Sequence, residues 1–167
     1  VKEAKGIPHM EDFETTIDLD IDAFIPEHYI ANEMQKLDIY KRIAGIENQE
    51  EYEDMLEELL DRFGEPPKKV QQLLKIAQLK ALANKAYITA IEQKGDDYIF
   101  TMYEKAKVNV AVIPALWKKH KGALAFKAEV VPYFQYRKLR KIKKETDDQV
   151  IEQVAAVIED ILSLSKN

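Results

Sequence analysis

One helix can be delimited from its sequence alone in the segment 47–67. Asn48 is a favoured N-cap residue, and Glu51 follows three residues later, where a capping box requires an acidic or amide side chain. Gly64 stands where helices commonly end, and the prolines at 66 and 67 cannot continue the helix. The sequence therefore predicts a helix over 49–63. Apolar residues spaced by three or four form its buried stripe: Tyr52, Met55, Leu56, Leu59, Leu60 and Phe63.

The opposite face of this predicted helix is acidic. Five carboxylates lie on it: Glu50, Asp54, Glu57, Glu58 and Asp61. Solvation is the commonest role of such a face, because charged side chains are mostly exposed in folded proteins. The periodicity by itself therefore indicates no partner for these carboxylates.

Composition limits the kind of protein that this chain can be. Its 167 residues, 46% of them hydrophobic, suffice for a folded core. The absence of cysteine excludes disulfide frameworks, thiol catalysis and zinc–thiolate sites, and it favours a reducing compartment such as the cytoplasm. We find neither a secretory signal pattern nor an apolar run of the roughly 18 residues that a membrane span needs, so we expect a soluble protein.

Charge is distributed unevenly along the chain. Residues 1–67 hold 6 basic and 19 acidic side chains, a net charge of −13, whereas residues 68–167 hold 19 basic and 11 acidic side chains, a net charge of +8. Such a split is compatible with a charged partner and equally with two halves that attract each other. The chain also starts at Val1 within what reads as a helix end. We therefore expect residues 1–12 to be the tail of a preceding element in a longer protein, and 13–167 to be one domain.

The first half of the chain predicts a strand and three helices. Residues 13–23 alternate between apolar and polar side chains, as in a half-buried strand. Its aspartates lack the glycine and glutamate of a calcium-binding loop, so we interpret them as a solvated strand face. Helices are expected over 27–44, over 49–63 and from Pro67 to about Ala86. The residues expected to point inward from the first of these helices are Ile30, Met34, Leu37 and Ile43.

The second half predicts a small sheet. Strands are expected over 87–93, 98–103, 124–130 and 133–139, and the first two form a hairpin around residues 94–97. A short helix over 114–120 is expected to be anchored by Trp117, and a last helix over 148–163 is expected to be capped by Asp147. A strand and three helices, then a mostly antiparallel sheet with a short helix and a closing helix, predict an α+β fold.

No catalytic, metal or cofactor motif is found in the sequence. The five glycines do not form a phosphate-binding loop, and the three histidines lack a partner at helical spacing. Ser163 and Ser165 are the only serines, and they lie near the C-terminus, where a nucleophile is poorly preorganised. We therefore expect no enzyme activity, no cofactor and no metal.

A basic cluster is the second feature that could bind a partner. Six basic residues lie between positions 137 and 144, directly after three aromatic residues at 133, 134 and 136. Basic side chains neutralise phosphates and aromatic rings stack on bases, so a nucleic-acid contact is one hypothesis. The alternative is the solvated end of a strand that runs into a connector. The residues assigned to the possible contact are Arg137, Lys138, Arg140 and Lys141.

Two sequence blocks resemble one protein family. The first begins Ile25-Pro26-Glu27-His28-Tyr29-Ile30 and continues through Tyr40-Lys41-Arg42-Ile43-Ala44; the second is Glu58-Leu59-Leu60-Asp61-Arg62-Phe63-Gly64. In this order they resemble the C-terminal domain of the bacterial transcription-repair coupling factors, the Mfd family. The resemblance covers about residues 13–163 and is loose after residue 87.

The resemblance implies a regulatory role without catalysis for this domain. It implies a large cytoplasmic parent protein with an ATP-driven, helicase-like DNA translocase, which removes stalled RNA polymerase and recruits UvrA for nucleotide excision repair. The domain is then expected to dock on a UvrB-like module of the same chain and to mask its UvrA-binding surface.

The resemblance also assigns residues to that docking surface. The family motif implies that Glu58 and Asp61 face arginines of the UvrB-like module, with Glu57 and Asp54 beside them. Glu58 and Asp61 are three residues apart, so they project from the same side of the predicted helix. We interpret Phe63 as the end of the apolar stripe and Arg62 as its flank.

Overall fold

The computed structural model describes residues 13–137 and 145–164. The chain divides into two compact units, and each is described by itself. One unit combines 21–81 with 146–154, and the other combines 1–20, 82–145 and 155–167. We call them the helical unit and the sheet unit. The α+β class predicted from the sequence is confirmed.

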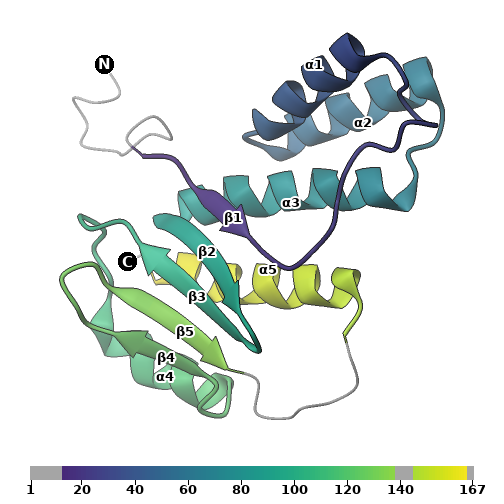
Figure 1. Ribbon diagram of the computed structural model, residues 1–167. Coiled ribbons are helices and arrows are strands. Elements are labelled where there is room, and N and C mark those ends of the chain that lie inside the picture. The colour runs from purple at the N-terminus through teal and green to yellow at the C-terminus, as the bar shows by residue number, and fades with distance from the viewer. Residues whose placement is uncertain (1–12, 138–144, 165–167) are drawn as a thin grey trace, which may run out of the picture. The chain divides into compact units, whose positions relative to one another are not determined.

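The helical unit is built from α1 (Glu33–Ala44), α2 (Gln49–Phe63), most of α3 (Lys68–Lys85) and the first part of α5 (Asp147–Ser163). Helices α1 and α2 pack against each other (Figure 1). Apolar residues from α1, α2 and α3, from the segment before α1 and from the loop between α1 and α2 fill one core. Its members are Ile25, Ile30, Ile39, Ile43, Ile46, Met55, Leu59, Val70, Leu74 and Ala77.

Helix α2 has the bounds that its sequence predicts. The Asn48 side chain accepts a hydrogen bond from the backbone N–H of Glu51 at 2.8 Å, so the predicted N-cap is confirmed. The Glu51 carboxylate accepts from the backbone N–H of Glu47, also at 2.8 Å, one residue before the position that a standard capping box uses. Gly64 ends the helix at a φ of +88°, a conformation that side chains with a Cβ rarely adopt. One prediction was wrong: Leu60 is 48% exposed.

Helix α1 starts six residues later than predicted. Residues 27–29 form a turn, and the side chain of Asn32 caps the helix by accepting from the backbone N–H of Gln35 at 3.0 Å. The predicted inward face of this helix was also partly wrong, because Ile39 and Ile43 lie on the side opposite to Met34 and Leu37. Ile39 and Ile43 are buried, whereas Met34 and Leu37, expected in the core, are 83% and 57% exposed.

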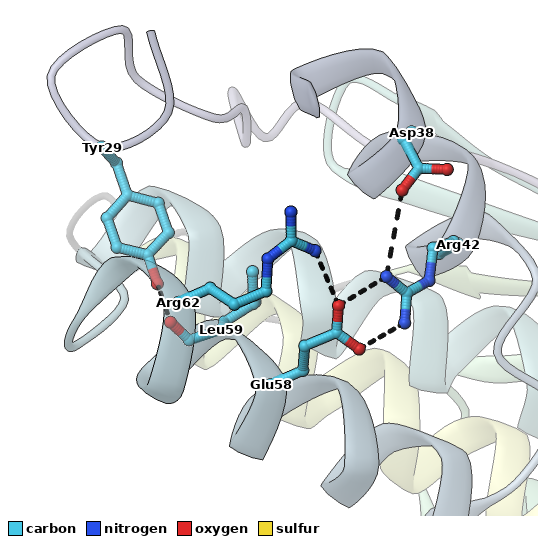
Figure 2. A network of polar contacts seen from close by, with 6 residues as sticks. All are labelled: Tyr29, Asp38, Arg42, Glu58, Leu59 and Arg62. Carbon is cyan, nitrogen blue, oxygen red and sulfur yellow. Dashed lines mark hydrogen bonds and ion pairs between the residues drawn. The ribbon is translucent and has the colours of Figure 1, made fainter. Parts of the chain in front are cut away.

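The turn before α1 is attached to the end of α2 by one side chain. The Tyr29 hydroxyl lies 2.7 Å from the carbonyl oxygen of Gly64. It also lies 3.3 Å from the carbonyl oxygen of Leu59 (Figure 2). Its ring also packs against Phe63, with the ring centroids 5.8 Å apart. The carbonyl groups at a helix C-terminus lack intrahelical partners, so Tyr29 satisfies one of these while fixing the turn.

The sheet unit contains one mixed sheet in the part of the chain that the structure describes. Its strands are β1 (Thr16–Asp18), β2 (Ile88–Lys94), β3 (Asp97–Met102), β4 (Leu124–Lys127) and β5 (Tyr133–Arg137). They lie in the order β1-β2-β3-β5-β4, and only the β1–β2 pair is parallel (Figure 1). The predicted hairpin is confirmed, with Lys94 opposite Asp97 across a turn in which Gly95 has a φ of +65°.

The first strand is much shorter than predicted. The sequence alternates over 13–23, but only Thr16–Asp18 pair with β2. Thr15, just before this strand, is buried and donates a hydrogen bond from its hydroxyl to the carbonyl oxygen of Ile88 at 2.6 Å. The side-chain alternation therefore extends beyond the backbone ladder.

Two predictions about the helices of the second half were also wrong. Helix α4 (Ile113–Lys119) forms beside β4, but its buried residue is Leu116, whereas Trp117 is 54% exposed. Helix α5 (Asp147–Ser163) is capped by Thr146 and not by Asp147. The Thr146 hydroxyl accepts from the backbone N–H of Gln149, whose side chain accepts in return from the backbone N–H of Thr146.

Within residues 13–137 and 145–164, no helix has the length and apolar character of a membrane span. Among the same residues, no three histidine, aspartate or glutamate side chains are grouped as metal ligands would be.

Candidate interaction surface on α2

The acidic side chains of α2 lie in two different settings. Asp54, Glu57 and Asp61, three of the four residues predicted for the docking surface, are exposed. Together with Glu50 they follow one another at intervals of four, three and four residues, so they form a single row along the helix. We call these four residues the carboxylate row. Glu58, the fourth predicted residue, lies beside the row and is partly buried against α1.

Glu58 is held by two arginines (Figure 2). Arg42 of α1 donates from Nη1 to Oε2 at 2.6 Å and from Nη2 to Oε1, which makes a two-point contact between the helices. Arg62, one turn further along α2, donates to Oε2 at 2.8 Å. Asp38 lies one turn before Arg42 on α1, with its carboxylate 3.9 Å from the same Nη1 atom. We call these four residues the ion cluster.

The ion cluster changes the electrostatics of Glu58. The hydrogen bonds from Arg42, and then those from Arg62, lower the pKa of Glu58 from 4.5 to about 2. The same contact with Glu58 raises the pKa of Arg42. Because both arginines lie within hydrogen-bonding distance, the negative charge of Glu58 is largely compensated inside the helical unit.

The negative charges of the carboxylate row, in contrast to that of Glu58, are not compensated by neighbouring basic side chains in the part of the chain that the structure describes. Among the residues that the structure describes, none forms a hydrogen bond or ion pair with the side chains of Asp54, Glu57 or Asp61. Their charges are therefore directed to solvent or to a partner. A row of this kind attracts a basic surface, and the attraction weakens as salt increases.

Arg62 has a second contact. Its guanidinium carbon lies 4.9 Å from the ring centroid of Phe63, over a ring that packs partly against the core. The predicted structural role of Phe63 is consistent with this position. Arg62, interpreted from the sequence only as a flank of the stripe, also bonds Glu58.

The sequence did not reveal that α1 contributes two residues to the ion cluster. Asp38 and Arg42 are four residues apart, which is a visible signal for an ion pair on one helix. The pairing of Arg42 with Glu58 joins residues 16 positions apart in different helices, and it depends on how α1 and α2 pack.

The structure describes only one residue of the basic cluster, Arg137. Arg137 ends β5, and its Nε and Nη2 atoms each lie 3.4 Å from a carboxylate oxygen of Asp97 on the neighbouring strand. Lys138, Arg140 and Lys141 lie outside the described residues. The one described member of the cluster is thus paired within the sheet.

Comparison with known proteins identifies the family. A model of the TRCF domain matches residues 19–113. The transcription-repair-coupling factor of Bacillus subtilis (strain 168) is 38% identical over 111 residues, which are 66% of this chain and 9% of that protein. That of Staphylococcus aureus (strain USA300) is 38% identical over 112 residues, covering 66% of this chain and 10% of that protein. The chain therefore spans about a tenth of the length of these relatives.

A solved structure extends the match to nearly the whole chain. The crystal structure of a C-terminal domain of transcription-repair coupling factor is similar with a TM-score of 0.71 and 26% sequence identity. The match covers 92% of this chain and 95% of the other. The family resemblance of the two sequence blocks is thus confirmed. The chain belongs to the TRCF domain family and is a C-terminal domain of a transcription-repair coupling factor.

Proposed function

We propose that this chain is one regulatory domain that docks on a UvrB-like module of its own parent chain and masks the UvrA-binding surface there. The observation that supports the proposal is the carboxylate row of α2, whose exposed charges have no partner among the described residues. Arginine side chains on the module would pair with these carboxylates, and such pairs have a defined geometry. The role requires no catalytic residue, cofactor or metal in this domain.

In this proposal Asp61 makes the central contact, with Asp54 and Glu57 beside it. Glu58 acts from the flank, because Arg42 and Arg62 already occupy both of its carboxylate oxygens. An arginine of the module can approach Glu58 only by sharing or replacing one of these two. The ion cluster therefore fixes the position of α2 relative to α1. The carboxylate row supplies the charges that are available to a partner.

The proposed contact can be both effective and reversible. Exposed ion pairs contribute about 0.2–1 kcal/mol each, so a few of them form a weak interface between separate molecules. Within one chain the partners meet at an effective concentration in roughly the millimolar range, which compensates for weak pairing. Engagement of the parent's motor with DNA and RNA polymerase would then suffice to release the domain and expose the surface for UvrA.

Charge reversal in the full-length parent protein tests the proposal. We expect Glu58→Lys/Asp61→Lys to tighten UvrA binding, because the domain no longer masks the module. Melting curves of the same variant separate unmasking from unfolding. Unchanged UvrA affinity in a folded variant would leave the carboxylate row as a solvated face.

A further inference from the structure

Two apolar side chains stand exposed together on α1. Met34 is 83% exposed and Leu37 is 57% exposed. Being three residues apart in one helix, they lie side by side on its surface. Single exposed apolar residues are common, but contiguous ones mark candidate interaction sites, and flexible methionines are frequent at protein-binding surfaces.

Met34 and Leu37 share α1 with two members of the ion cluster, Asp38 and Arg42. Asp38 follows Met34 by one helical turn and reaches Arg42, which in turn holds Glu58 (Figure 2). All of these residues belong to the helical unit. An apolar pair, the ion cluster and the carboxylate row thus follow one another across the two helices.

We propose that Met34 and Leu37 form the apolar centre of the docking surface whose charged rim is the carboxylate row. The inference rests on the proposed function and names the chemistry of the partner surface: an apolar pocket flanked by arginine or lysine side chains. This is the usual anatomy of a protein interface, in which buried apolar contacts provide much of the affinity and charged residues at the rim provide orientation.

The occupant is a surface of the same parent chain. Charge complementarity requires a basic rim, and about nine-tenths of the length of the curated relatives lies outside the matched segment. A partner in that remainder benefits from tethering. A second copy of this domain is the competing occupant. In a symmetric contact between two copies, the carboxylate row of one copy would lie close to that of the other. Repulsion between these like charges disfavours such a contact.

Chemical labelling measures whether Met34 is covered. The chain has no cysteine of its own, so Met34→Cys introduces a single thiol into it. Val130→Cys is the matched control, because Val130 is 87% exposed and lies in the sheet unit. In the full-length parent without UvrA, alkylation by iodoacetamide is followed by mass spectrometry on the peptide that carries each position.

We expect residue 34 to be alkylated at least about ten-fold more slowly than residue 130, because docking covers the first position and leaves the second exposed. Combining each cysteine with Asp54→Lys/Asp61→Lys should bring the two rates together. Equal rates without the charge reversal would overturn the inference. Protection of residue 34 that disappears on dilution would also overturn it, because that result identifies a second copy as the occupant.

UvrA affinity distinguishes this inference from the proposed function. Met34→Gln/Leu37→Gln should raise the affinity of the parent for UvrA about ten-fold, as expected when two apolar contacts of the masking interface are lost. Val130→Thr should leave the affinity unchanged. If charge reversal raises the UvrA affinity but Met34→Gln/Leu37→Gln does not, the proposed docking through the carboxylate row is supported and the proposed role of α1 is wrong. If neither change raises it, the proposed function fails as well.

Discussion

Arg42 of α1 and Glu58 of α2 face each other in a two-point contact, with Arg42 Nη1 2.6 Å from Glu58 Oε2. Arg62 reaches the same carboxylate oxygen at 2.8 Å. The contact joins the two sequence blocks that carry the family resemblance. It also divides the acidic side of α2 into a compensated residue, Glu58, and an uncompensated row beside it.

The first prediction concerns the stability that Glu58 contributes. Its pKa is about 2 in the folded chain against 4.5 ordinarily, so the charged form is favoured by folding. The resulting stabilisation is complete above about pH 4.5 and is lost as the pH falls through about 2. We expect Glu58→Gln to lower the free energy of unfolding by about 1 kcal/mol at pH 7, after allowance for solvent screening.

Denaturant unfolding at a series of pH values checks this prediction. The difference between Glu58→Gln and the unchanged chain should shrink as the pH falls below about 4.5. Glu57→Gln is the matched control, since Glu57 is exposed on the same helix and should change stability little. A constant difference at every pH would show that the ionised carboxylate of Glu58 is not responsible.

The second prediction tests which face of α2 points toward the core. Leu59 is fully buried, whereas the adjacent Leu60 is 48% exposed. We expect Leu59→Ala to lower the free energy of unfolding by about 3 kcal/mol, because it removes buried methyl groups and leaves a cavity. Leu60→Ala should lower it by less than about 1 kcal/mol. Similar losses for both variants in thermal or urea unfolding would contradict this orientation.

The third prediction concerns the start of α5. Thr146 and Gln149 exchange hydrogen bonds across the first turn, whereas Asp147 stands within the helix. Thr146→Ala should therefore destabilise the chain by about 1 kcal/mol. Asp147→Ala should cost less, roughly 0.3–0.5 kcal/mol, through its interaction with the helix dipole. A lower melting temperature for Asp147→Ala than for Thr146→Ala would indicate that Asp147 is the N-cap.

A fourth prediction concerns the basic cluster. Because the chain carries a net charge of −5 and Arg137 is paired with Asp97, we expect the chain to show no strongly salt-dependent binding to DNA. Neutralising Arg137, Lys138, Arg140 and Lys141 together should leave UvrA affinity of the parent unchanged. DNA binding at low salt that disappears with these four charges would instead support the nucleic-acid hypothesis.

Local signals explain which elements the sequence predicted well. The bounds of α2 follow from Asn48, Gly64 and the apolar spacing between them, all within one segment. The turn at Gly95 likewise defines the hairpin of β2 and β3. These features act over a few residues, so they can be read without knowing the tertiary structure.

Features that depend on packing were predicted less well. In α1 the apolar residues Met34 and Leu37 fit a helical stripe, but the core selects Ile39 and Ile43 instead. A signal was available in Asn32, whose position as an N-cap places the start of α1 correctly. The exposure of Trp117 and the shortness of β1 depend on neighbouring elements that the local pattern does not specify.

The candidate site shows the same limit. Periodicity correctly placed Asp54, Glu57 and Asp61 on the exposed side of α2. It could not show that Glu58 is held by Arg42, because that pairing depends on the approach of two helices. The assignment of these residues to a docking surface came from the family resemblance and remains a proposal.

The most direct test of the proposed masking is the affinity of the full-length parent for UvrA with one charge reversed at a time. Asp61→Lys alters the carboxylate row and leaves the ion cluster intact, whereas Glu129→Lys makes the same charge change at an exposed position of the sheet unit. We predict that Asp61→Lys tightens UvrA binding at an unchanged melting temperature, while Glu129→Lys has little effect. Equal affinities for Asp61→Lys, Glu129→Lys and the unchanged protein would contradict the proposed masking.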